Sequence, residues 1–124
     1  MNAWDQGDAD LAVRDYAEEM DWTNVFGVTC TSRDELRSLV ADMFSQPHVM
    51  AGRDLLMDQE IRFIRPDIAL AKTRVERHGQ LLPSGEPMGT RFTTHLRVFA
   101  RGEEGWKIVS HLISDSRTDG WPAR

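Results

Sequence analysis

The sequence lacks the residues that would build covalently linked, metal-bound or membrane-spanning structure. It has one cysteine, Cys30, among 124 residues, which excludes an intramolecular disulfide and any zinc or iron–sulfur site built from several cysteines. Its longest apolar runs fall far short of the ~18–20 residues that a bilayer-spanning helix needs. Acidic residues stand where a secretory leader would be basic and then apolar, at Asp5, Asp8 and Asp10. We therefore expect a cytoplasmic protein with no membrane partner.

Motifs for cofactors and metals are also missing. The chain has no Gly-x-Gly-x-x-Gly, no phosphate-binding loop and no Gly-x-Ser-x-Gly, so we expect neither a nucleotide cofactor nor serine hydrolase chemistry. No pair of histidines has the spacing of metal ligands, and we predict no metal site from the four in the chain: His48, His78, His95 and His111.

Acidic residues exceed basic ones, with 20 Asp and Glu against 15 Lys and Arg and a net charge of −5. Proteins that bind nucleic acid concentrate positive charge on one face, so we do not expect a nucleic-acid partner. The charge is uneven, because residues 1–62 carry 13 acidic and 5 basic side chains, whereas residues 63–124 carry 7 and 10. We interpret this as solvated faces of acidic helices and arginine-rich strands; the alternative is that some arginines face an anionic ligand.

Helix signals are confined to the first third of the chain. Asp8 can cap a helix whose apolar residues continue at helical spacing as far as Met20. A clearer capping box, Ser32 to Glu35, precedes apolar residues at i, i+3, i+4, i+7 and i+8, and predicts a helix over residues 32–45. Between the two, residues 21–27 are rich in aromatic and β-branched side chains and are predicted to form a strand.

Strand signals dominate the rest. Turns are predicted at Pro66-Asp67 and around Gly102 to Gly105. They join four antiparallel strands, over residues 57–63, 68–77, 91–101 and 106–114. We predict a single domain over residues 1–124 of the α+β class, a cone-shaped, bent antiparallel sheet with two or three helices on its concave face.

Several short segments, in this order and spacing, resemble the SnoaL-like branch of the nuclear transport factor 2-like superfamily, of the SgcJ/EcaC type. They are Trp4-Asp5-Gln6-Gly7-Asp8-Ala9, Tyr16-Ala17, Asp21-Trp22-Thr23-Asn24-Val25-Phe26-Gly27, Phe63-Ile64-Arg65-Pro66-Asp67-Ile68-Ala69 and Gly105-Trp106-Lys107-Ile108. The resemblance spans the chain. It implies a half-barrel with an apolar pocket between sheet and helices, and a dimer formed through the outer face of the sheet.

The chain departs from a relative with known chemistry. Ketosteroid isomerase places a tyrosine seven residues before the glycine that matches Gly7, a carboxylate base seventeen after it, and a second acid on the penultimate strand. Here the tyrosine position falls before Met1, the base position is Asn24, and the second acid matches Thr94 or, after a one-residue shift, His95. An amide cannot abstract a proton near pH 7, so we do not expect isomerisation by that mechanism. The short N-terminus predicts either a missing pocket wall or a start codon assigned late.

The candidate site rests on strand parity. Asn24 shares parity with Trp22, so a buried Trp22 would turn Asn24 toward a pocket; the alternative is that Asn24 bonds neighbouring backbone groups. In the final hairpin, a three-residue connection would put His95 and His111 on one face. We favour a four-residue connection, which groups Thr94 with His111 on a mostly apolar face and turns His95 outward. His111 can then serve in acid–base chemistry or be a core histidine. The predicted catalytic residues are His111 and Asn24, and the predicted substrate-binding residues are Trp22, Asn24, Thr94 and His111.

Two functions are consistent with these features. The first is a small-molecule-binding pocket protein that acts as an enzyme on an apolar metabolite, polyketide-like or polycyclic as the resemblance implies, by acid–base catalysis. The second is a non-catalytic ligand-binding or dimerisation module of the same fold, which the missing isomerase carboxylates favour. Apolar residues at both parities of the last two strands predict a homodimer through the outer sheet face.

Overall fold

The computed structural model describes residues 6–116, which form one six-stranded sheet and three helices. The helices are α2 (Ala9–Val13), α3 (Arg33–Phe44) and α4 (Pro47–Met50); the strands are β1 (Tyr16–Thr23), β2 (Thr29–Ser32), β3 (Arg53–Arg65), β4 (Ile68–His78), β5 (Arg91–Gly102) and β6 (Gly105–Asp115). Their order across the sheet is β2-β1-β6-β5-β4-β3. Neighbours are antiparallel except β1 and β6, which are parallel. The predicted α+β class with a bent sheet is confirmed.

The sequence correctly predicted helix α3. Ser32 caps it by accepting a hydrogen bond from the Glu35 backbone N–H at 3.1 Å, and the Glu35 carboxylate reaches back to the Thr31 backbone N–H. Its apolar side chains Leu36 and Val40 are buried. Because these residues lie one turn apart on the same side of the helix, α3 presents one continuous apolar stripe to the sheet.

The predicted helix from Asp8 to Met20 is wrong in its second half. The helix ends at Val13, and the chain re-enters the sheet at Tyr16 as strand β1. Tyr16 and Met20 are both buried, a spacing of four that suits a helix as well as a strand. The strand resolves the ambiguity with a register shift between Tyr16 and Asp21, which places Met20 and Trp22 against the core.

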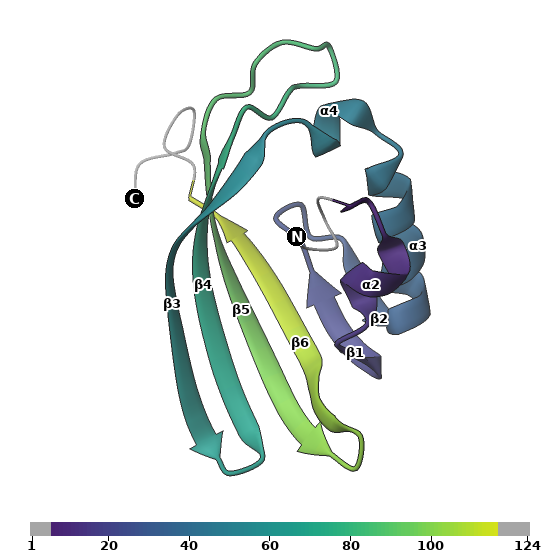
Figure 1. The fold of residues 1–124 in the computed structure, drawn as a ribbon, viewed down its shortest axis with the longest axis vertical. Helices are drawn as coiled ribbons and strands as arrows, with labels where there is room; N and C mark the ends of the chain where they lie inside the picture. Colours follow the sequence, from purple (N-terminus) through teal and green to yellow (C-terminus); the bar gives the residue numbers. More distant parts are fainter. Residues whose placement is uncertain (1–5, 117–124) are drawn as a thin grey trace.

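The core lies at one end of the sheet. Figure 1 shows α2 and α3 beside β1 and β2, with β3 at the opposite edge. The side chains of Leu36 and Val40 pack into one buried cluster with residues of β1 and β6, namely Tyr16, Met20, Trp22 and Ile108. We call the sheet face that carries this cluster the inner face. No helix in the described range 6–116 is long and apolar enough to cross a membrane.

The inner face is covered unevenly. Strand partners line up in rows across it, and one row runs Phe63, Ala69, Phe99, Ile108 and Tyr16 from β3 to β1. At the β1 end Tyr16 is 8% exposed, whereas at the β3 end Phe63 is 62% exposed. The inner face therefore grades from a closed core under the helices to an open apolar edge.

Candidate functional site

A β-bulge in the last hairpin determines which side chains face the core. The turn is as predicted, since Gly102 pairs with Gly105. Farther along, Phe99 pairs with Ile108 but Val98 pairs with Ser110, so β6 carries one extra residue, Val109. One inserted residue reverses the facing of every residue beyond it.

The bulge corrects the predicted facing of the histidines. His111 pairs with Arg97 rather than Leu96, and His95 shares its face instead of turning outward. Thr94 has the opposite parity and pairs with Arg74 on the outer face, so the grouping of Thr94 with His111 is wrong.

Four side chains on the inner face form a continuous hydrogen-bonded chain. The Tyr16 hydroxyl lies 2.6 Å from His111 Nδ1, and His111 Nε2 lies 2.8 Å from His95 Nδ1. The other His95 nitrogen, Nε2, lies 3.4 Å from Thr93 Oγ1, a longer and weaker contact. The chain thus runs from β1 through β6 to β5, from the buried core toward the open part of the sheet.

Tautomerism gives this chain a direction. If the Tyr16 hydroxyl donates to His111 Nδ1, then His111 Nε2–H donates to His95 Nδ1, and His95 Nε2 carries a hydrogen. If the chain runs the other way, His95 Nδ1–H donates to His111, and His95 Nε2 presents a lone pair. Both arrangements hold the same number of protons. The exposed end of the chain can therefore be a donor or an acceptor without any change in net charge.

The environment keeps both imidazoles neutral. Burial lowers the pKa of His111 to about 2, and the charge of Arg97 and the neighbouring His95 add to the effect. Burial lowers the pKa of His95 to about 4; Arg97 and Arg91 lower it further, while Asp54 opposes them. Burial raises the pKa of Tyr16 despite Arg97, which acts on its hydroxyl by charge and as a hydrogen-bond donor. At pH 7 the chain is uncharged, and Arg97 is the cation beside it.

The structure brings together two of the predicted site residues. Trp22 and His111 are strand partners, and their rings meet edge-on with centroids 6.4 Å apart. Both are buried, at 6% and 4% exposed. Trp22 thus fixes one side of the His111 ring. Stacking against Tyr16, at 6.0 Å between centroids, restrains it further.

Asn24 is placed differently. It follows the last residue of β1, and its side-chain oxygen accepts hydrogen bonds from the backbone N–H groups of Phe26 and Val28, at 2.9 and 3.0 Å. These bonds hold the turn between β1 and β2, which is the structural alternative considered for Asn24. Its catalytic and ligand-binding roles stay predictions.

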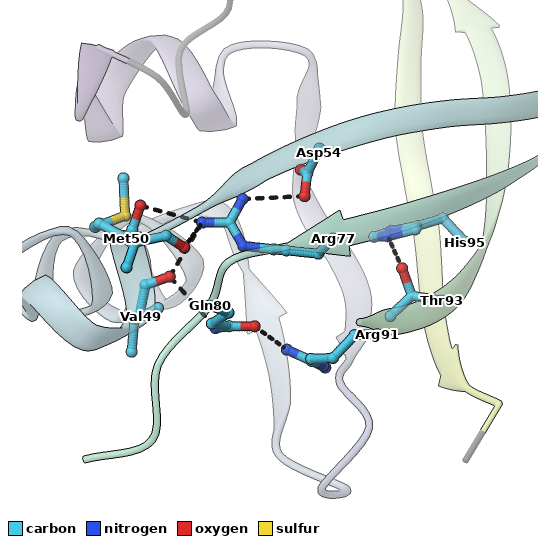
Figure 2. Close-up of polar contacts among 9 residues, drawn as sticks. Val49, Met50, Asp54, Arg77, Gln80, Arg91, Thr93 and His95 are labelled. Carbon is cyan, nitrogen blue, oxygen red and sulfur yellow. Dashed lines mark hydrogen bonds and ion pairs between the residues drawn. The ribbon is translucent and has the colours of Figure 1, made fainter. Parts of the chain in front are cut away.

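A second polar network joins the ends of β3 and β4 to α4 (Figure 2). Arg77 is 9% exposed and forms an ion pair of 3.0 Å with Asp54. Its Nη2 also donates to the carbonyl oxygens of Val49, Met50 and Ala51. Because a helix C-terminus carries partial negative charge, this arginine stabilises the end of α4. Its charge is therefore satisfied within the protein.

Arg91 lies beside this network and is also paired. It forms an ion pair of 3.2 Å with Asp115, whose side chain is 8% exposed, and donates to Gln80 Oε1 at 2.9 Å. Figure 2 shows Arg77 and Arg91 linked through Val49 and Gln80, with His95 and Thr93 in a separate contact.

A surface groove of about 530 Å³ lies away from the histidine chain, next to α2 and α3. Its charged side chains largely pair with acidic neighbours, as Arg37 does with Asp10 and Arg33 with Glu18. No group of three or more potential metal ligands is found among residues 6–116.

Known structures share this fold. An uncharacterised protein with a cystatin-like fold from Caulobacter vibrioides is 19% identical, with a TM-score of 0.82 over 94% of this chain and 82% of that one. An NTF2-like protein with a cystatin-like fold from Novosphingobium aromaticivorans is 18% identical, with a TM-score of 0.71 over 96% and 75%. The chain has the nuclear transport factor 2-like fold. A ketosteroid isomerase-like protein from Erwinia carotovora atroseptica also shares it, at 13% identity and a TM-score of 0.72 over 94% and 87%.

At these identities the likeness establishes the nuclear transport factor 2-like fold and no function. No protein-family model matches the sequence, and no curated protein matches it either. Any function must therefore be argued from the site itself.

Three members of the hydrogen-bonded chain were not among the predicted site residues: Tyr16, His95 and Thr93. Tyr16 was assigned to a helix, although it is the only tyrosine of the chain. His95 was turned outward because the bulge was not foreseen. The three-residue connection would have placed both histidines on one face, by a different route from the one the structure uses.

Proposed function

We propose that this protein is a small-molecule enzyme that moves protons on an apolar substrate bound at the inner face, with His95, His111 and Tyr16 as its acid–base groups. The observation that carries the proposal is the pair of short hydrogen bonds, 2.6 Å and 2.8 Å, that joins these three titratable side chains in series. A core histidine needs only its own two partners. Here the second partner is another imidazole, which continues the chain toward the open part of the sheet.

The neutral state of the chain supports this chemistry. With the pKa of His95 lowered to about 4, its ring is free of a proton on one nitrogen throughout the neutral range. His95 Nε2 can take a proton from a substrate carbon in one tautomer and deliver a proton to a substrate oxygen in the other. The proton that His95 Nε2 takes from the carbon is the one that it returns to the substrate oxygen, so the chain gains no net proton over the whole step. Between the two transfers, the hydrogen bond between His95 Nδ1 and His111 Nε2 shares the added positive charge. This replaces the isomerase carboxylate, whose position is occupied by Asn24.

The substrate class follows from the resemblance to SnoaL-like proteins and from the apolar edge of the sheet. On β3 the side chains of Leu56, Ile61 and Phe63 are 57%, 62% and 62% exposed, and their strand partners belong to the inner face. An apolar polycyclic or polyketide-like molecule has the shape and chemistry to cover them.

Proton exchange on a bicyclic ketone tests the proposal. We expect the protein to accelerate deuterium incorporation next to the carbonyl of 2-tetralone in D₂O, followed by NMR. His95→Gln should slow the exchange by about tenfold or more, because a positioned acid–base group typically contributes 10²–10⁴-fold. His48→Gln, which changes a histidine on α4 outside the chain, is the matched control.

The alternative function is a ligand-binding module without catalysis. It is favoured if wild-type protein binds 2-tetralone, but the compound exchanges deuterium no faster with wild-type protein than with the His95→Gln variant. Exchange that is equally slow with wild-type protein, His95→Gln and free buffer contradicts the enzyme proposal.

A further inference from the structure

The row of strand partners that includes His111 also contains Arg97, a cation that has no carboxylate partner. From β3 to β1 the strand partners in this row are Ile61, Ala71, Arg97, His111 and Trp22. Since directly opposed residues point to the same side of a sheet, the Arg97 side chain belongs to the inner face. It stands between His111 and Ala71, which are both buried, at 4% and 6% exposed.

Two other inner-face arginines are at least partly buried, and they show how this protein treats a desolvated guanidinium; Arg101, on the same face, is exposed. Arg77 is paired with Asp54, and Arg91 with Asp115. Arg97 is half-buried, as Arg91 is, yet it forms no ion pair with any Asp or Glu of residues 6–116. A partly desolvated charge without a counter-charge is costly unless something outside the chain pairs with it.

We propose that Arg97 is a binding residue for the anionic oxygen group of the substrate, so that the substrate class is an apolar carboxylate rather than a neutral hydrocarbon. This inference rests on the proposed function only for the location of the ligand. Arg97 directs part of its guanidinium at the Tyr16 hydroxyl, and a guanidinium has further N–H donors, two of which can bind a carboxylate through parallel hydrogen bonds. The neutral imidazoles beside it add hydrogen-bond partners without competing for the charge.

The dimensions of the sheet define the rest of the ligand. Neighbouring strands lie ~4.8 Å apart, so Arg97 on β5 is about 10 Å from the exposed apolar side chains of β3. A bicyclic aromatic carboxylate covers that distance. Its charged end lies at Arg97, and its rings lie against the side chain of Ile61 on β3, which is 62% exposed. His95, one position further along the inner face of β5, then faces the carbon atoms next to the carboxylate.

Binding of 2-naphthoate and its neutral analogue 2-naphthamide, measured by isothermal titration calorimetry at pH 7 and low salt, tests the proposal. We expect wild-type protein to bind 2-naphthoate more tightly than 2-naphthamide. Arg97→Met should weaken 2-naphthoate by about tenfold or more and leave 2-naphthamide unchanged, because only the carboxylate uses the guanidinium. Arg97→Lys keeps the charge without the paired donors, so its affinity for 2-naphthoate should lie between those of wild-type protein and Arg97→Met.

Arg62→Met is the matched control. Arg62 lies one residue from Ile61 on β3, points to the outer face, and forms no ion pair with residues 6–116. Its replacement should change neither affinity. If Arg97→Met does not fold, two measurements still test the carboxylate site: the preference of wild-type protein for 2-naphthoate over 2-naphthamide, and the affinity of Arg97→Lys for 2-naphthoate.

Two results would overturn the proposal. One is that wild-type protein binds both compounds equally or binds neither; the other is that Arg97→Met weakens both compounds alike. These outcomes are separable from the proposed function, because they measure affinity and not exchange. Tight, Arg97-dependent naphthoate binding without 2-tetralone exchange would contradict the acid–base proposal alone, and exchange without naphthoate binding would contradict the carboxylate site alone.

Discussion

The buried histidine pair makes the folded protein sensitive to mild acid. Both imidazoles are neutral in the fold, with the pKa lowered to about 4 for His95 and about 2 for His111. In the unfolded chain a histidine titrates near ~6.5. Between these values the unfolded state binds more protons than the folded state, so the free energy of unfolding falls as the pH falls. The stability that the neutral histidines allow is fully present above the unfolded pKa. It is lost as the pH falls from that value toward the folded pKa.

The size of the loss follows from these pKa values. Between pH 7 and pH 5 each histidine reduces the free energy of unfolding by about 2 kcal/mol, because each is still unprotonated in the fold at pH 5 while its unfolded form is mostly protonated. The two together remove roughly 4 kcal/mol, a large part of the ~5–15 kcal/mol that stabilises a typical domain. The charged groups near the pair are Arg97, Arg91 and Asp54, and only Asp54 favours protonation of His95.

Urea unfolding at pH 7, 6 and 5, followed by tryptophan fluorescence, measures this loss. We expect wild-type protein to lose roughly 4 kcal/mol over the range, and His95→Gln to lose about half as much, because one titrating group remains. His48→Gln should keep the wild-type pH dependence. Asp10 and Glu35 also have a lowered pKa, from 3.8 and 4.5, so their effects fall mainly below pH 5 and outside the measured range.

The reasoning would be refuted by a free energy of unfolding that changes by less than about 1 kcal/mol between pH 7 and pH 5, or by equal losses in wild-type protein and His95→Gln. Either result would mean that the imidazoles are solvated or charged in the folded protein. The proton-transfer chain, which requires them to be neutral, would then fail as well.

Three further predictions concern the core, the β1–β2 turn and the outer face. Leu36→Ala should lower the free energy of unfolding by about 3 kcal/mol because Leu36 is 1% exposed, whereas Leu112→Ala, at 51% exposed, should cost under ~1 kcal/mol; equal costs in urea unfolding would contradict the assigned core. Asn24→Leu should cost about 1–2 kcal/mol because the Phe26 and Val28 backbone N–H groups lose their acceptor; weaker 2-naphthoate binding by the folded variant would restore the predicted role of Asn24 in ligand capture. We also propose a homodimer through the outer sheet face: light scattering should give twice the 14.2 kDa chain mass, Leu112→Asp should shift it to the monomer, and a monomeric wild type would exclude the dimer.

Local signals in the sequence were sufficient for most of the fold. The capping box at Ser32 and the turn at Pro66-Asp67 are short-range features, and the structure places α3 and the β3–β4 hairpin where they indicate. The predicted helix to Met20 failed because two buried residues four apart fit either period. Packing decided for a strand there, since β1 pairs with β2 on one side and with β6 on the other.

The site was harder to predict than the fold because it depends on register between distant strands. His111 was predicted to face inward, with Trp22 in the wall of the same pocket, from strand parity, a four-residue hairpin connection and the family resemblance together. Tyr16 is 95 residues from His111 in the sequence, and it reaches His111 because β1 pairs in parallel with β6. No local sequence pattern predicts that pairing. Long-range pairing of this kind is fixed by the whole hydrophobic pattern rather than by any one segment.

The bulge at Val109 links these observations. Without the extra residue, the regular register from Gly102 and Gly105 would keep His95 and Arg97 on the inner face with Phe99, but it would turn His111 to the outer face with Thr94 and Leu96. The hydrogen-bonded chain would then lose His111, the central member that joins Tyr16 to His95. The spacing of two core residues on β6 reflects this bulge. Ile108 and Ile113 both pack in the core, although residues five apart on a regular strand point to opposite faces. A strand that buries both must therefore contain an irregularity between them. A conflict of parity between two core residues on one strand is therefore the pattern that would have located the bulge and, with it, the site.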